Sequence, residues 1–169
     1  MKLPYQLQEL TLYPNWVVYR FFKSKVLTSK LPFDPINHIP ARTNEPNTWT
    51  TFEIANNTLR SHSYNGIGFV FSENDPYIGI DLDNCIHFNQ INDFAHKILN
   101  ILNSYTEYSP SKTGLHIICK SNTINYPIGI KKDKIEVYNI NRFFTITGEV
   151  FRPSNINNID IDLINGILS

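Results

Sequence analysis

The stretch Tyr77-Ile78-Gly79-Ile80-Asp81-Leu82-Asp83 alternates apolar residues with glycine or aspartate. Successive side chains of a β-strand point to opposite faces, so the even-numbered residues would face a core, while Asp81 and Asp83 share the other face. Carboxylates two residues apart on a strand have Cα atoms about 6.5–7 Å apart, which is near enough to share a divalent cation. A lone Asp-x-Asp pair is also typical of a solvated strand end.

Two later segments repeat this alternation. In Gly114-Leu115-His116-Ile117-Ile118-Cys119, His116 lies opposite an apolar face, and in Lys134-Ile135-Glu136-Val137-Tyr138, Glu136 does the same. This parity allows Asp81, His116 and Glu136 to share one face of a sheet. Carboxylate oxygens are the ligands that Mg²⁺ and Mn²⁺ prefer. The three segments together predict a metal-binding site.

A loop suited to phosphate comes immediately before the second segment. Ser109-Pro110-Ser111-Lys112-Thr113-Gly114 combines hydroxyls, a lysine and a glycine that permits close backbone approach. Such loops also occur as plain turns. The chain has neither a Gly-x-x-x-x-Gly-Lys-Ser/Thr nor a Gly-x-Gly-x-x-Gly sequence, which argues against a P-loop ATPase or a dinucleotide-binding domain.

The remaining pattern predicts an α+β domain. Helices are expected from the capping box at Thr50-Thr51-Phe52-Glu53 and over 93–103. The turn residues 72–76 predict a hairpin between strands at 67–71 and 77–83. Further strands are expected at 16–21, 114–120, 134–138 and 143–147. This order favours a largely antiparallel sheet with helices on one side.

Composition narrows the class of protein. The 169 residues suffice for one domain, 41% of them are hydrophobic, and the net charge is zero, so any DNA contact must come from a local patch. Cys85 and Cys119 are too few for a zinc site and are expected to be buried apolar residues. No segment resembles a signal peptide or a membrane span, so we expect a cytoplasmic protein without a membrane partner.

In order and spacing, the segments 79–83, 109–116 and 135–138 resemble the three-motif signature of the archaeo-eukaryotic primase superfamily. The strand 142–148 is similar to the segment that follows the third motif in the phage and plasmid primase-polymerase branch. The N-terminal elements 16–20, 30–33 and 48–52 are similar to that branch too. The resemblance covers roughly residues 15 to 150. Many relatives have glycine where this chain has Lys112.

The resemblance implies a primase-polymerase fold at residues 1–153. Its catalytic subdomain, about 66–153, would be related to the RNA-recognition motif, with a mainly antiparallel sheet, and would pack on an N-terminal α/β unit, about 1–65. Residues 154–169 would form a tail or linker toward a downstream domain. In mobile genetic elements such domains are often fused to a replicative helicase, which makes a fused or associated helicase the expected protein partner.

The resemblance also implies template-dependent nucleotidyl transfer in DNA replication. A 3′-hydroxyl would attack a nucleoside triphosphate (dNTP and/or NTP) on a single-stranded DNA template, releasing pyrophosphate, with two Mg²⁺ or Mn²⁺ ions. The implied ligands of these ions are Asp81, Asp83 and Glu136. The residues expected to bind the nucleotide are Ser109, Ser111, Lys112, His116 and Arg142. Weaker candidates for template contact are Arg20 and Lys30.

Three alternatives remain open from the sequence. The same fold could serve as a non-catalytic DNA-binding module of a replication initiator, or the acids could activate water in a metal-dependent nuclease. Trp16 and Trp49 could stack on bases or pack in the core. Asp160 and Asp162 repeat the alternation in Ile159-Asp160-Ile161-Asp162, but no histidine strand follows, so we expect a solvated segment or a helix start there.

Overall fold

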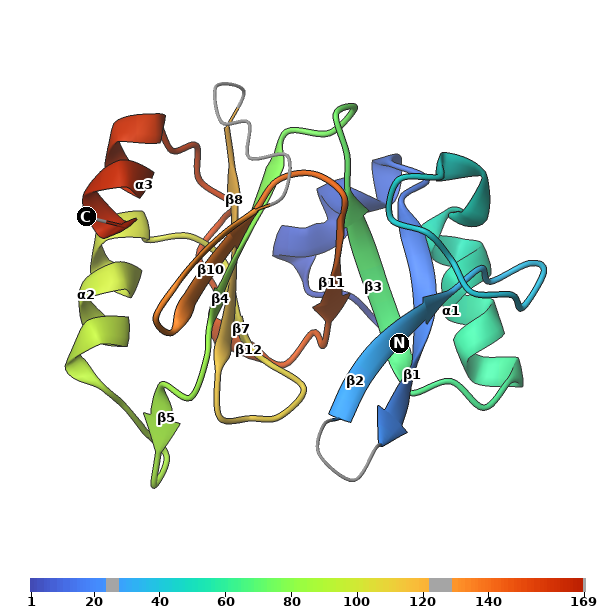
Figure 1. The fold of residues 1–169 in the computed structure, drawn as a ribbon, viewed down its shortest axis with the longest axis horizontal. Coiled ribbons are helices and arrows are strands. Elements are labelled where there is room, and N and C mark those ends of the chain that lie inside the picture. Colours follow the sequence, from blue (N-terminus) through green and yellow to red (C-terminus); the bar gives the residue numbers. More distant parts are fainter. Residues whose placement is uncertain (24–27, 122–128, 169) are drawn as a thin grey trace.

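The computed structural model describes residues 1–23, 28–121 and 129–168, and Figure 1 shows two facing sheets with helices outside them. The four-stranded sheet contains, in spatial order, β11 (Arg142–Ile146), β3 (Gly66–Phe71), β1 (Trp16–Lys23) and β2 (Thr28–Phe33). The six-stranded sheet contains β12 (Val150–Arg152), β7 (Thr106–Tyr108), β8 (Leu115–Lys120), β4 (Tyr77–Leu82), β10 (Ile135–Tyr138) and β9 (Ile130–Lys132). The pairings within both sheets are antiparallel, as predicted.

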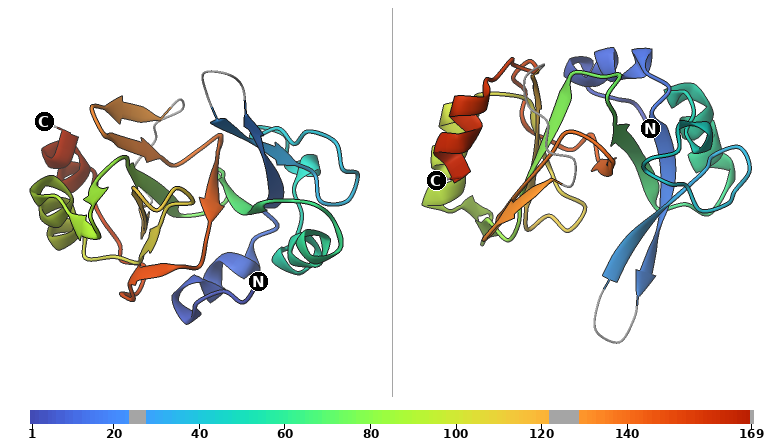
Figure 2. Two further views of the ribbon diagram at one scale, coloured as in Figure 1. Left: turned by 90° about the horizontal axis from the view of Figure 1, so that it is seen from below. Right: turned by 45° about the horizontal axis from the view of Figure 1, so that its top comes forward.

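The helices lie on both outer flanks of the molecule. Helix α1 (Phe52–Ser61) lies outside the four-stranded sheet, while α2 (Asp93–Leu102) and α3 (Ile161–Leu168) lie outside the six-stranded sheet (Figures 1 and 2). The expectation of helices on one side therefore holds for each sheet but not for the whole domain. Shorter elements are the 3₁₀ helices η1 (Tyr5–Leu12) and η2 (Pro46–Thr48) and the small hairpin of β5 (Ile86–His87) and β6 (Gln90–Ile91). None of the helices in the described ranges is long and apolar enough to cross a membrane.

The core between α2 and the six-stranded sheet confirms the alternation predicted for three strands. The apolar residues assigned to the inner face are all buried there, namely Ile78, Ile80, Leu82, Leu115, Ile117, Cys119, Ile135 and Val137. They pack on one face of α2, which begins where the Asn92 side chain accepts a hydrogen bond from Ala95 N and ends at Asn103 in the left-handed conformation. Cys85 and Cys119 are free and buried, as expected.

Both tryptophans belong to the core of the four-stranded sheet. Trp16 packs edge-on against Phe52 at 5.0 Å and Phe69 at 5.3 Å between ring centroids, and its indole N–H donates to the Leu10 carbonyl. Trp49 is also buried, and its N–H donates to the Arg42 carbonyl. Core packing, and not base stacking, therefore accounts for both residues.

The predicted hairpin of 67–71 and 77–83 is wrong, because β3 and β4 belong to different sheets. The chain changes sheets at the turn 72–76, where the Asp75 carboxylate accepts hydrogen bonds from Ser72 N and Tyr77 N. Strand β3 pairs instead with β1 and β11, and its residues 67–71 are all buried. Turn chemistry marks a change of direction, but strand pairing depends on remote partners.

The division at residue 65 does not follow the sheets. Strands β3 and β11, which the sequence assigned to the catalytic subdomain, complete the N-terminal sheet. Strand β2 forms its edge, although 30–35 has turn-like composition; an edge strand tolerates Pro32. Helix α1 begins one residue later than the capping box indicated, with Thr51 as its N-cap.

The segment after Pro153, expected to be a tail or linker, packs on the fold. The carbonyl oxygens of Asn155 and Asn157 accept hydrogen bonds from Tyr105 N and Lys120 N. Ile156, Ile159 and Ile164 are buried, and α3 lies beside α2. This segment therefore contributes to the core of the domain.

Gly68 leaves space for the Phe143 ring on one face of the four-stranded sheet. A Cβ at this position would lie 2.7 Å from Phe143 Cδ2 and 3.1 Å from the Phe144 carbonyl oxygen. We expect Gly68→Ala to lower the free energy of unfolding by about 1–3 kcal/mol, because the ring and the backbone must shift. Gly166→Ala in α3, where a Cβ meets nothing within 4 Å, is the control, and chemical denaturation measures both. Equal stabilities for the two variants would contradict this packing.

Candidate active site

Five strands place ionisable side chains directly opposite one another across the six-stranded sheet. Glu107 of β7 pairs with His116 of β8, and His116 pairs with Asp81 of β4. Asp81 pairs in turn with Glu136 of β10, which pairs with Lys131 of β9. Opposite residues in an antiparallel ladder share a face. The predicted parity of Asp81, His116 and Glu136 is thus confirmed, and the row also includes Glu107 and Lys131.

Asp81 lies at the centre of this row, between His116 and Glu136. Its Oδ1 is buried and has no hydrogen-bond partner among the described residues, and His116 Nε2 lies 3.8 Å from it. Burial raises the pKa of Asp81 above its usual value, and the neighbouring His116 partly opposes this shift. A half-buried carboxylate with one unpaired oxygen is suited to a cation.

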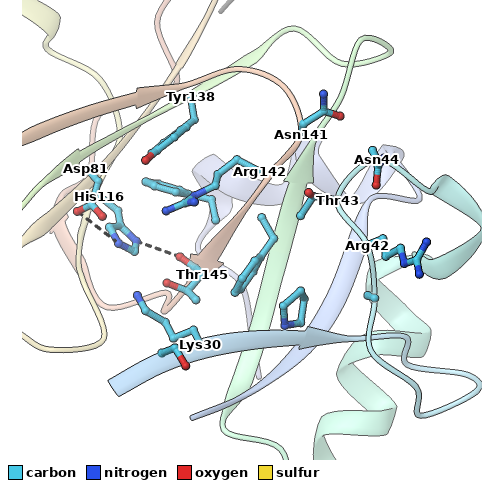
Figure 3. Close-up of a pocket in the computed structure, with 15 residues that line it drawn as sticks. Lys30, Arg42, Thr43, Asn44, Asp81, His116, Tyr138, Asn141, Arg142 and Thr145 are labelled. Carbon is cyan, nitrogen blue, oxygen red and sulfur yellow. Dashed lines mark hydrogen bonds and ion pairs between the residues drawn. The ribbon is translucent and has the colours of Figure 1, made fainter. Parts of the chain in front are cut away.

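His116 is held so that one ring nitrogen faces Asp81. The Thr145 carbonyl can only accept a hydrogen bond, so His116 Nδ1, 3.0 Å away, must donate to it. The ring also packs on Phe144, with centroids 4.2 Å apart. Figure 3 shows the ring between Asp81 and Thr145, with Nε2 on the Asp81 side. This leaves Nε2 as the nitrogen that can meet a ligand.

Glu136 differs from Asp81 because it has partners. Its carboxylate contacts Lys131 Nζ and accepts a hydrogen bond from the Tyr138 hydroxyl, and Arg142 Nη2 lies 3.7 Å away. Burial works to raise the pKa of Glu136, but the hydrogen bonds from Lys131 and Tyr138 hold it below its usual value. Burial and the bond to Glu136 raise the pKa of Tyr138 to about 12.

The row borders a pocket of about 590 Å³ that residues of both sheets line. Figure 3 shows Asp81, His116 and Tyr138 on one side of it, with Thr43 and Asn44 across from them. Lys30 of β2 and Arg142 of β11 bring positive charge to the same pocket. Burial lowers the pKa of Lys30, while the charges of Asp81 and Asp83 partly counteract this shift. The pocket lining therefore combines the acid Asp81 with cationic side chains, as a site for a metal-bound phosphate compound requires.

The other predicted residues lie around this pocket or away from it. Asp83 is exposed just beyond β4, and its N–H donates to the Lys134 carbonyl. Arg20 does not line the pocket; its guanidinium lies over the rings of Tyr64 and Phe33, at 4.5 and 5.4 Å. Of the two weaker candidates for template contact, only Lys30 lines the pocket beside Asp81.

The loop 109–114 lies at the end of β4 and not in the pocket lining. The hydroxyls of Ser109, Ser111 and Thr113 form a hydrogen-bonded chain, and Lys112 Nζ pairs with Glu149 Oε2 at 2.9 Å. A Cβ on Gly114 would lie 2.6 Å from the Leu82 carbonyl and 3.6 Å from Asp83 Cα. This close approach requires glycine and places the loop beside Asp83.

The backbone at Lys112 has a conformation that favours glycine. Its φ of 61° lies in the left-handed region, which glycine adopts without strain. We expect Lys112→Gly to stay within about 1 kcal/mol of the original free energy of unfolding, since relief of strain offsets the loss of an exposed ion pair. Lys112→Ala, which keeps the strain and loses the pair, should be the less stable variant in thermal unfolding. The reverse order would contradict this explanation.

The predicted metal ligands do not close around one point in this structure. No group of three His, Cys, Asp or Glu side chains within residues 1–23, 28–121 and 129–168 is arranged to hold a metal ion. The sequence prediction also missed Glu107, Thr43 and Asn44. The loop that carries Thr43 and Asn44 has no periodicity, and β7 is too short to show one.

Comparison with known proteins gives one informative similarity. No protein-family model matches the chain. The DNA primase-polymerase of Nitratiruptor phage NrS-1 is 32% identical over 171 aligned residues, which include 97% of this chain. The chain spans 23% of the length of that phage protein. This similarity over nearly the whole chain supports the primase-polymerase domain that the three sequence motifs indicate.

Proposed function

We propose that this chain catalyses template-dependent nucleotidyl transfer on single-stranded DNA, synthesising primers, extending DNA, or both. The observation that carries the proposal is the row of Asp81, His116 and Glu136 on one sheet face. Asp81 and His116 line a pocket together with Lys30 and Arg142, and Glu136 lies 3.7 Å from Arg142. A nucleoside triphosphate needs cations at its phosphates and carboxylates for its divalent ions. The similarity to the phage primase-polymerase supports the same reaction.

The acids fit a divalent ion by their chemistry. Asp81 Oδ1 is a buried acceptor without a hydrogen-bond partner in the described part of the chain, and Asp83 follows two residues later, just beyond the end of β4. Asp81, Asp83 and Glu136 would hold Mg²⁺ or Mn²⁺, and Glu136 would exchange its contact with Lys131 for this role. When bound, such ions lower the pKa of the attacking hydroxyl and neutralise charge on the phosphates.

The cationic and polar residues would orient the triphosphate. His116 lines the pocket from the six-stranded sheet, with Nε2 on the side of Asp81. Lys30 and Arg142 line the same pocket from the four-stranded sheet. Arg142 is held over the Tyr138 ring, 4.5 Å from its centroid, which limits the positions of its guanidinium. The loop beside Asp83 would contact the part of the triphosphate that extends past this residue, through Ser109, Ser111 and Lys112. These groups would contribute to catalysis by positioning the triphosphate and by stabilising the negative charge on its phosphates.

The test is primer synthesis on single-stranded DNA with Mg²⁺ or Mn²⁺ and either dNTPs or NTPs. We expect products that require the template and release pyrophosphate. A parallel incubation of labelled DNA with Mn²⁺ and no nucleotide separates the nuclease alternative, which predicts shortened DNA. DNA binding without either reaction would favour the non-catalytic module. A replicative helicase as partner stays a prediction, tested by co-purification with the helicase of the same replicon.

A further inference from the structure

Glu107 is a fully buried acid to which the proposed reaction assigns no role. Its side chain is 0% exposed, and it stands next to His116 in the row. Its Oε1 lies 3.7 Å from His116 Nδ1. In the described part of the chain, no lysine or arginine pairs with it. A carboxylate in such a position is expensive to bury unless its hydrogen bonds are satisfied.

The hydrogen bonds of Glu107 fasten the turn that follows β11. Oε1 accepts from Thr147 N at 2.8 Å, and Oε2 accepts from Gly148 N at 2.9 Å and from the Tyr105 hydroxyl at 3.0 Å. Thr145 lies near the end of β11, just before this turn, and its carbonyl accepts the hydrogen bond from His116 Nδ1. Glu107 therefore contacts both the His116 ring and the turn at 147–148, and this turn follows directly on the strand whose Thr145 carbonyl binds the same ring.

We propose that Glu107 is a positioning residue that holds the His116 ring with Nε2 toward Asp81 and the pocket. It acts twice, through direct contact with the Nδ1 side of the ring and through the turn that fixes the Thr145 carbonyl. Carboxylates behind a functional histidine set its orientation in this way elsewhere. The part of the proposal that concerns nucleotide binding rests on the proposed function; the orientation of the ring does not.

The test compares Glu107→Gln with Tyr105→Phe. Thr147 N and Gly148 N donate to different oxygens of Glu107, and glutamine keeps the size of the side chain but replaces one of these oxygens by an NH2 group, which cannot accept from a backbone N–H. Phenylalanine removes only the hydroxyl that donates to Glu107 and leaves the carboxylate in place. Exchange of the His116 Nδ1–H with water, followed by ¹⁵N-histidine NMR and assigned with His116→Asn, reports the orientation directly.

We expect this exchange to be at least about tenfold faster in Glu107→Gln and unchanged in Tyr105→Phe, with the KM for nucleotide raised about tenfold only in the former. Unchanged exchange in Glu107→Gln, or equal acceleration in both variants, would overturn the proposal. Should Glu107→Gln fail to fold, Glu107→Asp, whose shorter side chain withdraws from the ring, is expected to show the same faster exchange. A wild-type chain without nucleotide binding or product would refute the proposed function, while the NMR comparison would still decide the role of Glu107.

Discussion

Replacing Asp81 and Asp83 together by asparagine is expected to lower primer synthesis by about a thousandfold or more. Asparagine keeps the shape of the side chains but removes the charge that a divalent ion requires. The measurement is kcat/KM for nucleotide incorporation on single-stranded DNA at fixed Mn²⁺ concentration. Substantial remaining activity would show that the acids of β4 are not the metal ligands.

A matched control lies in the same chain. Asp160 and Asp162 have the same spacing, but Asp160 accepts a hydrogen bond from Leu163 N at the start of α3, far in sequence from the row. The double change Asp160→Asn/Asp162→Asn keeps this cap, since asparagine caps helices as well as aspartate does. We expect unaltered activity from this variant. A loss equal to that of the β4 variant would point to a general effect on the domain.

The single variant Asp81→Asn should also be the more stable protein. Asp81 Oδ1 is buried without a hydrogen-bond partner in the described ranges, and burial raises the pKa of the carboxyl group, so its charged form opposes folding. We expect a gain of about 1 kcal/mol, seen as a higher Tm together with lost activity. This combination would separate a functional role of Asp81 from damage to the fold.

Trp16→Ala is expected to have the largest effect on stability, about 3–5 kcal/mol. The indole is 0% exposed, packs on Phe52 and Phe69, and donates to the Leu10 carbonyl. Alanine therefore leaves a cavity and removes one of the two hydrogen bonds that this carbonyl accepts, the other coming from Tyr13 N. A loss of this size is a large part of the stability of a domain. Urea denaturation followed by circular dichroism measures it.

Leu12→Ala is the control for that change. Leu12 lies four residues earlier and is 81% exposed, so its removal should change the free energy of unfolding by less than about 0.5 kcal/mol. If Trp16→Ala were as mild as Leu12→Ala but weakened DNA binding, base stacking and not core packing would be the role of Trp16.

The alternation of residues by itself determined which side chains of each central strand share a face. Ile80 and Asp81 had to lie on opposite sides of β4, because side-chain direction in a strand follows from the backbone alone. The same local rule placed His116 and Glu136 on the face of Asp81 once their strands paired, and it predicted α2 from its apolar period. The burial of Trp16 could be weighed but not decided from the sequence.

Only the tertiary structure decided which strands are neighbours. The turn 72–76 gave no indication that β3 joins one sheet and β4 the other, because pairing energy comes from residues far away in the sequence. The pocket likewise depends on β2 and β11, which bring Lys30 and Arg142 to acids on the other sheet. Glu107 entered the row through a three-residue strand too short for a period to be seen. Local patterns set the direction of each side chain, whereas the long-range packing of two sheets sets its partners.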